Sequence, residues 1–456
     1  MLALLRRRDF ALLWTGGLVS VAGDYVLHAA LPFFVYAQTE STVATAGMIA
    51  AQLAPDVVLG TVAGVFVDRW DRTRVLVISN LLQAAAVALL LLVPLDGWLW
   101  VVFVVAAVQS AVAAFAVPAE GALLPSLVDN ADLVAANALN ALNNRLARLI
   151  GVPVGGVLLA AFGLHEVVLV DCATFVVAAV LIAPLGARPA RRDGADQVVL
   201  GAADETAGEQ ARTAWARFWS EWVGGMRLIR GDRILFTIFA VLGLMTFGGT
   251  MLDPLTVAWV RDELLAGPEI YALLMSVHAA SGIVGTLVVG HFGATLSPRH
   301  LIGWASLVAG LTNLISYNVP LITLAVAVAA STGVSSVFSS VGVETMVQRG
   351  VADAYRGRVY GALGASGSLL SLLGAATAGI FAEVVGVVVM LSVAAGLIML
   401  AGVVVLWAFA GERALPAANR GTGDRPQATA SEASTDVKNA NPSVPGPHSD
   451  STACSG

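Results

Sequence analysis

The sequence contains few charged residues and almost no cysteine. Charged residues make up 12% of the 456 residues, hydrophobic residues make up 57%, and the mean hydropathy is +0.81. A water-soluble protein of this size could not cover its surface with so few charges, so the composition predicts a polytopic membrane protein. The two cysteines, Cys172 and Cys454, lie in an apolar run and in the C-terminal tail, which indicates neither a disulfide framework nor a zinc site.

The signatures of several enzyme classes are also missing. The sequence has no Gly-x-x-x-x-Gly-Lys phosphate loop, so the chain is not expected to power itself by ATP hydrolysis. It has no nucleophile elbow, His-Glu-x-x-His or Cys-x-x-Cys motif, and its six histidines lack metal-ligand spacing. Most basic residues lie in loops beside the membrane, which argues against a nucleic-acid partner. We therefore expect no enzyme activity, no cofactor and no metal.

Twelve apolar runs are each long enough to cross a bilayer, which takes about 20 residues. The expected fold is an all-α polytopic membrane protein with twelve transmembrane helices in two six-helix bundles. The runs of the first half are about 10–37, 42–67, 75–93, 98–124 and 132–162, followed by a sixth that ends near Pro184. The runs of the second half are about 234–259, 268–293, 300–317, 320–347, 358–382 and 386–410.

Composition divides the chain into four parts. Residues 1–186 and 234–411 are the expected N-terminal and C-terminal bundles, and residues 412–456 form a Ser-, Thr- and Pro-rich tail that we expect to be disordered. Residues 187–233 form a cytoplasmic linker. Within it, over about 213–233, aromatic and apolar residues recur every three or four positions, with arginines on the other side. This pattern predicts an amphipathic helix on the membrane surface.

The basic residues predict the orientation. Of the 25 Lys and Arg residues, only Arg261 falls in a loop on the far side, and Arg145 and Arg148 lie within the fifth predicted helix. The rest share the side of the N-terminus, so both termini are expected in the cytoplasm. We expect a monomeric multi-pass protein of the cell (plasma or inner) membrane that contacts the lipid bilayer.

The turn between the second and third predicted helices carries the most specific motif. Its residues are Gly64, Asp68, Arg69, Arg72 and Arg74, with the spacing Gly-x-x-x-Asp-Arg-x-x-Arg-x-Arg. A plain interpretation is a positively charged cytoplasmic turn without further function. The spacing, however, resembles the signature between helices two and three of the major facilitator superfamily. That resemblance implies a transporter built from two parallel six-helix repeats around a central cavity.

Other segments resemble the branch of this superfamily that includes macrolide and siderophore (enterobactin) exporters. The resemblance covers about residues 8–410. Its motifs are Arg8-Asp9-Phe10, Ser20-x-x-Gly23-Asp24, Pro118-Ala119-x-x-Ala122-Leu-Leu-Pro125, Ala136-Asn137-Ala138-Leu139, Val170-Asp171-x-Ala173-x-Phe175 and Gly357-Arg358-Val359. Two features depart from the exporter pattern: Pro153 stands one place late in the helix-five glycine motif, and Ala106 replaces a helix-four arginine that many proton-coupled exporters carry.

Two acids at the predicted cytoplasmic ends of helices suggest a gate. Glu120 and Glu344 recur at equivalent places in the two halves, at the level of the motif arginines and of Arg358. Salt bridges among these groups would close the cytoplasmic face and would break when it opens. The alternative is ordinary solvated charge at helix ends, which contributes little.

Ionisable residues at membrane depth are candidates for coupling, because burying them is costly. Asp24 lies on the first helix, whereas Arg145 and Arg148 share a face of the fifth helix. One hypothesis is a structural ion pair that holds the first bundle together. The other is that Asp24 exchanges a proton or a substrate contact against Arg145 during transport.

The resemblance implies that helices one, four, seven and ten line the substrate cavity. Together with two amides of helix five, they offer a mostly apolar wall with a few polar groups, which suits a moderately hydrophobic organic molecule. The candidate cavity residues are Phe33, Phe34, Gln109, Phe115, Met245, Phe247, Met251, Ser335, Ser336, Phe338 and Ser339, with Asn140 and Asn144 of helix five.

The sequence therefore predicts a secondary active transporter. The expected function is proton-coupled export of a small amphipathic organic compound, such as a drug, an antibiotic or a siderophore-like metabolite, by alternating access. Uptake of a metabolite by the same fold is a second hypothesis. A third, from another class, is a membrane sensor that does not transport and uses the amphipathic helix and the tail for docking.

Overall fold

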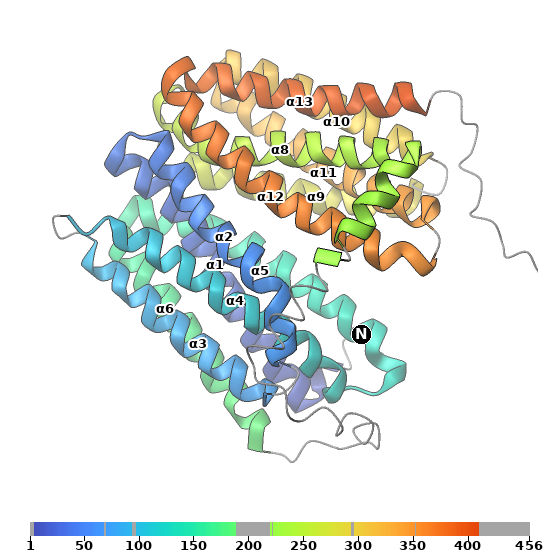
Figure 1. The fold of residues 1–456 in the computed structure, drawn as a ribbon. Coiled ribbons are helices and arrows are strands. Elements are labelled where there is room, and N and C mark those ends of the chain that lie inside the picture. Colours follow the sequence, from blue (N-terminus) through green and yellow to red (C-terminus); the bar gives the residue numbers. More distant parts are fainter. Residues whose placement is uncertain are drawn as a thin grey trace, which may run out of the picture. The chain divides into compact units, whose positions relative to one another are not determined.

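The computed structural model describes residues 4–67, 70–93, 97–187, 219–220, 222–292, 296–351 and 353–409. Their regular secondary structure is helical, and six long helices build the first half (Figure 1). These are α1 (Arg8–Thr39), α2 (Thr42–Val67), α3 (Arg72–Ala88), α4 (Trp100–Leu127), α5 (Leu133–Phe162) and α6 (Leu164–Ile182). Short 3-10 helices cover Leu4–Arg6, Leu89–Leu92, Asn130–Asp132 and Ala183–Ala187.

Six further long helices build the second half. They are α8 (Arg233–Asp262), α9 (Pro268–Phe292), α10 (Pro298–Asn318), α11 (Ile322–Gly350), α12 (Asp353–Val385) and α13 (Val387–Ala408). Each of the twelve predicted apolar runs coincides with one of these helices, which confirms the predicted fold class.

Local sequence sets several of the helix ends. The Asp71 side chain accepts a hydrogen bond of 2.8 Å from the backbone N–H of Arg74 and so caps the start of α3. Gly163 and Gly386 have φ angles of 90° and 95° in the turns from α5 to α6 and from α12 to α13. Because side chains disfavour this backbone region, glycine is suited to the same turn in each half.

The two halves repeat one packing pattern. In the first half, α1 packs on α5 and α6, α2 packs on α4, and α3 packs on α4 and α6. In the second half, the corresponding pairs recur: α8 packs on α12 and α13, α9 on α11, and α10 on α11 and α13. Between the halves, α5 packs on α9 and α2 packs on α12, so each contact joins a fifth helix to a second helix. This is the arrangement of two parallel repeats.

Only α10 lacks the mean apolarity of a membrane span. Length and composition identify eleven candidate spans within the described residues, and α10 is the long helix left out. Its outer face is nevertheless apolar, because Trp304, Val308, Leu311 and Ile315 are exposed on one stripe. Polar residues of α10 that face the protein interior lower the mean hydropathy of this helix. A hydropathy average therefore misses this span, whereas its exposed stripe suits lipid.

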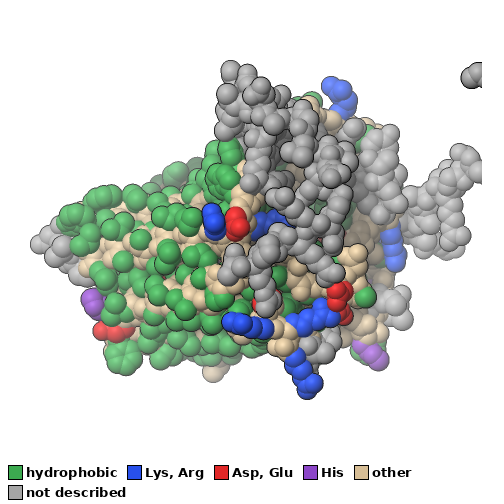
Figure 2. All heavy atoms as spheres, turned by 90° about the horizontal axis from the view of Figure 1, so that it is seen from below, with side chains coloured by type: hydrophobic (Ala, Val, Ile, Leu, Met, Phe, Trp, Pro, Cys, Tyr) green, Lys and Arg blue, Asp and Glu red, His purple; other side chains and the backbone are tan. Residues whose placement is uncertain are grey.

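Apolar side chains cover much of the protein surface. Figure 2 shows a face on which hydrophobic side chains are widespread, whereas Lys and Arg side chains lie in its central and right-hand parts. Large exposed hydrophobic residues include Val180, Leu287, Val384 and Trp407. A soluble monomer rarely exposes so much apolar area, but a bilayer covers it without cost.

The predicted surface helix is described only in part. Residues 222–231 are helical, whereas 213–218 and 221 lie outside the described residues. The Trp222 indole N–H donates to the Ser366 hydroxyl at 3.2 Å, and Ile229 is buried. One face of this helix therefore packs on α12, a protein contact that the prediction of a membrane-surface helix did not include.

Candidate functional site

A network of hydrogen bonds joins the two halves at one end of the helices. This end carries residues 40–41 and 263–267, and we call it the closed end; the motif end is the opposite one, where α3 begins. At the closed end Arg261 donates to the Tyr36 carbonyl at 2.9 Å and to Glu40 at 3.2 Å, and the Tyr36 hydroxyl donates to Asp262. The Ser41 hydroxyl donates to Glu383 at 2.5 Å.

Two glycines allow the helices to meet closely at the closed end. A β-carbon on Gly156 of α5 would lie 2.0 Å from the Ala272 β-carbon of α9. A β-carbon on Gly379 of α12 would lie 2.4 Å from the Ala46 β-carbon of α2. Both distances are too short for any side chain. The two cross-bundle helix pairs therefore depend on glycine at equivalent places.

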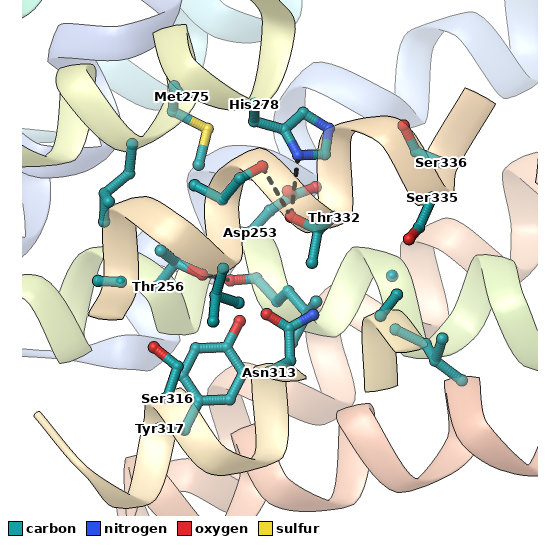
Figure 3. A pocket seen from close by; sticks show the side chains of 18 of the residues that line it. Asp253, Thr256, Met275, His278, Asn313, Ser316, Tyr317, Thr332, Ser335 and Ser336 are labelled. Atoms are coloured by element: carbon teal, nitrogen blue, oxygen red, sulfur yellow. Dashed lines mark hydrogen bonds between the residues drawn. The ribbon is translucent and has the colours of Figure 1, made fainter. Parts of the chain in front are cut away.

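A cavity of about 330 Å³ lies mainly within the second half (Figure 3). Helices α8, α9, α10 and α11 supply most of its wall, and Arg148 reaches it from α5 of the first half. Its polar lining residues are Arg148, Asp253, Thr256, His278, Ser306, Asn313, Ser316, Tyr317, Thr332, Ser335, Ser336 and Ser339. The volume is within the range of small-molecule sites.

The cavity combines opposite charges with hydroxyl and amide groups. Figure 3 shows His278 facing Thr332, with their Nδ1 and Oγ1 atoms 3.3 Å apart and Asp253 nearby. Asp253 and Arg148 are both exposed residues. The positive charge of Arg148 acts on both Asp253 and His278. Such a wall can orient an amphipathic molecule through a few polar contacts, while Met245, Leu252 and Met275 contact its apolar parts.

Comparison with known proteins identifies the family. The sequence model described as "Major Facilitator Superfamily" matches residues 13–257 and 238–442. The chain belongs to the Major Facilitator Superfamily. It is therefore a multi-pass membrane transporter, as the motif of residues 64–74 had suggested.

Relatives within the superfamily include named efflux proteins. The chain is 25% identical over 384 residues to macrolide efflux protein A of Streptococcus pyogenes, covering 83% of this chain and 90% of the relative. It is 26% identical over 358 residues to the uncharacterized transporter YfiS of Bacillus subtilis, covering 77% and 81%.

Solved structures share the superfamily fold. The nucleoside transporter NupG has a TM-score of 0.67 at 14% identity and covers 88% of this chain and 98% of that one. A bacterial homologue of the iron transporter ferroportin in the inward-facing state has a TM-score of 0.66 at 17% identity, with 88% and 98% covered. At these identities the likeness shows the fold alone.

Of the predicted cavity residues, Met245, Ser335, Ser336 and Ser339 line the cavity described above, whereas the predicted phenylalanines, the three amides and Met251 do not. Phe33 is buried between the halves, with its ring centroid 6.3 Å from that of Tyr271, whereas Phe34 packs on the first-half core. Phe247 packs on the second-half core. Phe338 lines a separate apolar groove on α10 and α11. Phe33, Phe34 and Phe247 thus pack in helix contacts, and Phe338 lines a groove apart from the cavity.

The three predicted amides lie in the first half. Asn144 accepts a hydrogen bond of 3.0 Å from the Tyr25 hydroxyl, and Asn140 interacts with the Glu120 carboxylate. The Gln109 side-chain nitrogen is buried without a hydrogen-bond partner. All three are therefore separate from the cavity of the second half.

The predicted ion pair between Asp24 and the arginines of α5 is absent from this structure. Arg145 donates to the Thr286 hydroxyl of α9 at 2.9 Å, and Arg148 lines the cavity. Neither makes an ion pair of 4.0 Å or less with Asp24. The reason is the rotation of α5, which turns its charged face toward the second half. Asp24 instead lies beside Asp171 of α6, close enough for their charges to interact.

The predicted gate is described only in part. Asp68, Arg69 and the Arg358 side chain lie outside the described residues, and Gly64 lies in the last part of α2. Arg72 donates to the Ala122 carbonyl at 3.1 Å, and the backbone N–H of Arg74 is held by the Asp71 cap.

The two predicted gate acids bond within their own halves. Glu120 interacts with Asn140 and lies near Gly17 of α1. Glu344 accepts hydrogen bonds from Gln348 at 2.9 Å and from Tyr360 at 2.8 Å. Neither forms an ion pair with Arg72 or Arg74 in this structure, because Glu120 turns into its bundle and Glu344 bonds to its neighbours.

The sequence interpretation missed the polar face of α10. Ser306, Asn313 and Ser316 are seven and three residues apart, which places them on one side of a helix, opposite the exposed apolar stripe. The sequence signal for this cavity-facing side of α10 is a polar stripe on a helix whose opposite face is apolar.

Proposed function

We propose that this transporter exports a small amphipathic organic compound by alternating access, driven by proton antiport. The main support is a combination of two features. Hydrogen bonds between the two halves close one end of the helices. Behind that end lies a cavity with polar and apolar lining residues, which come from both halves. The relatives named macrolide efflux protein favour export, and macrolides are amphipathic molecules of the proposed class.

The closed end is proposed to face the outside. The basic residues of the loops favour a cytoplasmic motif end, where Arg72 and Arg74 lie. The structure then represents a state that is shut toward the outside. Export would require the Arg261, Tyr36 and Glu383 contacts to break after the substrate binds, while the motif end closes.

The function can be tested by drug accumulation. Cells that express the protein are expected to accumulate less erythromycin than cells with the empty vector, and a protonophore is expected to abolish the difference. In proteoliposomes, an imposed pH gradient should drive erythromycin uphill. Higher accumulation in expressing cells would favour uptake, and no flux of any tested compound would favour a sensor.

Arg261→Gln is expected to weaken the closed end. The change removes charged hydrogen bonds to Tyr36 and Glu40 that together contribute about 1–2 kcal/mol, since one partner is exposed to solvent. The measurement is labelling of Ser316→Cys, a cavity position, by an impermeant thiol reagent from outside, in a Cys172→Ser/Cys454→Ser background. We expect labelling to rise about 5- to 30-fold. Arg227→Gln, at an exposed position, is the control, and equal labelling of the two variants would contradict the assignment.

A further inference from the structure

The interior of the first half holds a carboxyl group that no donor satisfies. Asp171 of α6 is 0% exposed, and its Oδ2 atom has no hydrogen-bond partner. Its Oδ1 atom has only a long contact of 3.4 Å with the Thr174 hydroxyl, which also donates to the Asp171 carbonyl at 2.7 Å. An ionised carboxylate without donors is costly in such a place, so the group is expected to carry a proton.

The Asp171 carboxyl lies close to the backbone of α1 at Gly23. A β-carbon on Gly23 would lie 2.5 Å from Asp171 Oδ1 and 2.0 Å from Thr174 Oγ1. Only glycine at position 23 therefore allows α6 to place these oxygens on α1. The next residue of α1 is Asp24, whose charge acts on Asp171. Asp24 is partly exposed, so it connects the buried carboxyl to the space beside α1.

No described cation balances the two carboxyl groups. None of the described Arg or His side chains lies within 4.0 Å of Asp24 or Asp171. Cys172, the neighbour of Asp171, donates its S–H to the Ala84 carbonyl of α3. The other ionisable residues of the described helices packed on α1 and α6 include Tyr25, His28, Asp56, Arg72, Arg74, Glu120, Arg145, Arg148, Asp253 and His278.

We propose that Asp171 is the acid of a proton-binding site within the first half, with Asp24 of α1 as a neighbouring acid, and that this proton is bound and released in the transport cycle. The charge of Asp24 acts on Asp171, so ionisation of one acid disfavours ionisation of the other. A metal ion is disfavoured, because hard cations take about six or more oxygen ligands. The described neighbours offer two carboxyl groups and the Thr174 hydroxyl.

The proposed proton site differs from the ion pair between Asp24 and Arg145 that the sequence predicted. In the structure, the charge of Asp24 acts on an acid of α6, whereas Arg145 and Arg148 extend toward the second half. The proton site and the cavity therefore lie in different halves. Coupling between them would act through the relative motion of the halves, since α5 contacts α1 on one side and α9 on the other.

Proton binding can be tested without transport by infrared titration of the purified full-length protein. The wild type is expected to show a carboxylic-acid C=O band, sensitive to D₂O, that disappears as the pH rises. Asp171→Asn should remove this band, and Asp24→Asn should change the pH at which it disappears. Asp56→Asn, at an exposed position of α2, is the control and should leave it unchanged. A band that persists in Asp171→Asn, or that responds to Na⁺ in place of H⁺, would overturn the proposal.

A second pair of variants tests the geometry without removing an acid. Gly23→Ala should displace Asp171 and Thr174 and shift the midpoint of the titration. Gly17→Ala should not, because its β-carbon would have ordinary contacts of 3.4 Å and longer. Equal midpoints for the two variants would contradict the site. Thermal unfolding of each variant checks that it is folded.

The role of the proton in transport rests on the proposed function. In proteoliposomes, Asp171→Asn is expected to lower the erythromycin accumulation driven by a pH gradient by about 5- to 150-fold, the usual range of coupling between two sites. Exchange of labelled for unlabelled erythromycin should persist. If the wild type moves no erythromycin, the proposed function fails while the infrared result still decides proton binding. Uphill transport by Asp171→Asn at the wild-type level would overturn the coupling role alone.

Discussion

Asp253→Asn is expected to abolish most erythromycin binding. The Asp253 carboxylate is the one acid among the described residues that line the cavity, and erythromycin carries a basic amine. Asparagine keeps the size of the side chain but removes its charge. A hydrogen bond between charged groups contributes about 1.5–3 kcal/mol, so the dissociation constant should rise about 10- to 100-fold. Binding is measured by scintillation proximity with labelled erythromycin.

Arg148→Gln is expected to change erythromycin binding in the direction opposite to that of Asp253→Asn. The charge of Arg148 acts on Asp253 from the facing half, so Arg148→Gln should leave Asp253 more available to a cation and tighten erythromycin binding. Glu263→Gln, exposed beyond the end of α8, is the control and should have no effect. Weaker erythromycin binding in Arg148→Gln together with normal binding in Asp253→Asn would contradict the assignment of Asp253 as the partner of the amine.

Leucine at both glycine contacts of the closed end is expected to stop transport. In the Gly156→Leu/Gly379→Leu double variant, each new side chain overlaps the facing helix, since even a β-carbon would lie within 2.4 Å of it. Overpacking costs about 1–3 kcal/mol for each contact. Together the two contacts should lower the population that is shut at the closed end by roughly 30-fold or more.

The readout is labelling of Ser316→Cys from outside, together with erythromycin transport. Labelling should become nearly complete while transport falls to background. The matched control is Gly290→Leu/Gly361→Leu, where a β-carbon meets no atom within 4 Å. Normal transport by the closed-end variant would show that these helices need not meet during the cycle.

The sequence predicted the helices well because their signals are local. Each span needs a long apolar run, and each of the twelve runs became a helix. The Asp71 cap and the glycine turns at 163 and 386 also depend on neighbouring residues only. The family could be inferred because its motif lies in one short turn.

The candidate site was predicted less well because it depends on how the helices rotate. The spacing of Arg145 and Arg148 shows that they share a face of α5, but a helix has no local signal for the partner of that face. Packing of α5 between α1 and α9 turned the arginines toward the second half. This structure therefore lacks an ion pair between Asp24 and Arg145, and the exchange of contacts between them during transport stays a prediction.

Composition and local periodicity thus determined the twelve membrane helices, and the motif of residues 64–74 indicated the transporter family. The tertiary structure alone decided which groups come together: Asp171 lies against Gly23, Gly156 lies against Ala272, and the charges of Asp24 and Arg148 act on Asp171 and Asp253. The physical reason is that hydrophobicity acts on each segment by itself. Contacts between side chains, in contrast, require each helix to adopt one rotation, and that rotation is set by close packing against all of its neighbours.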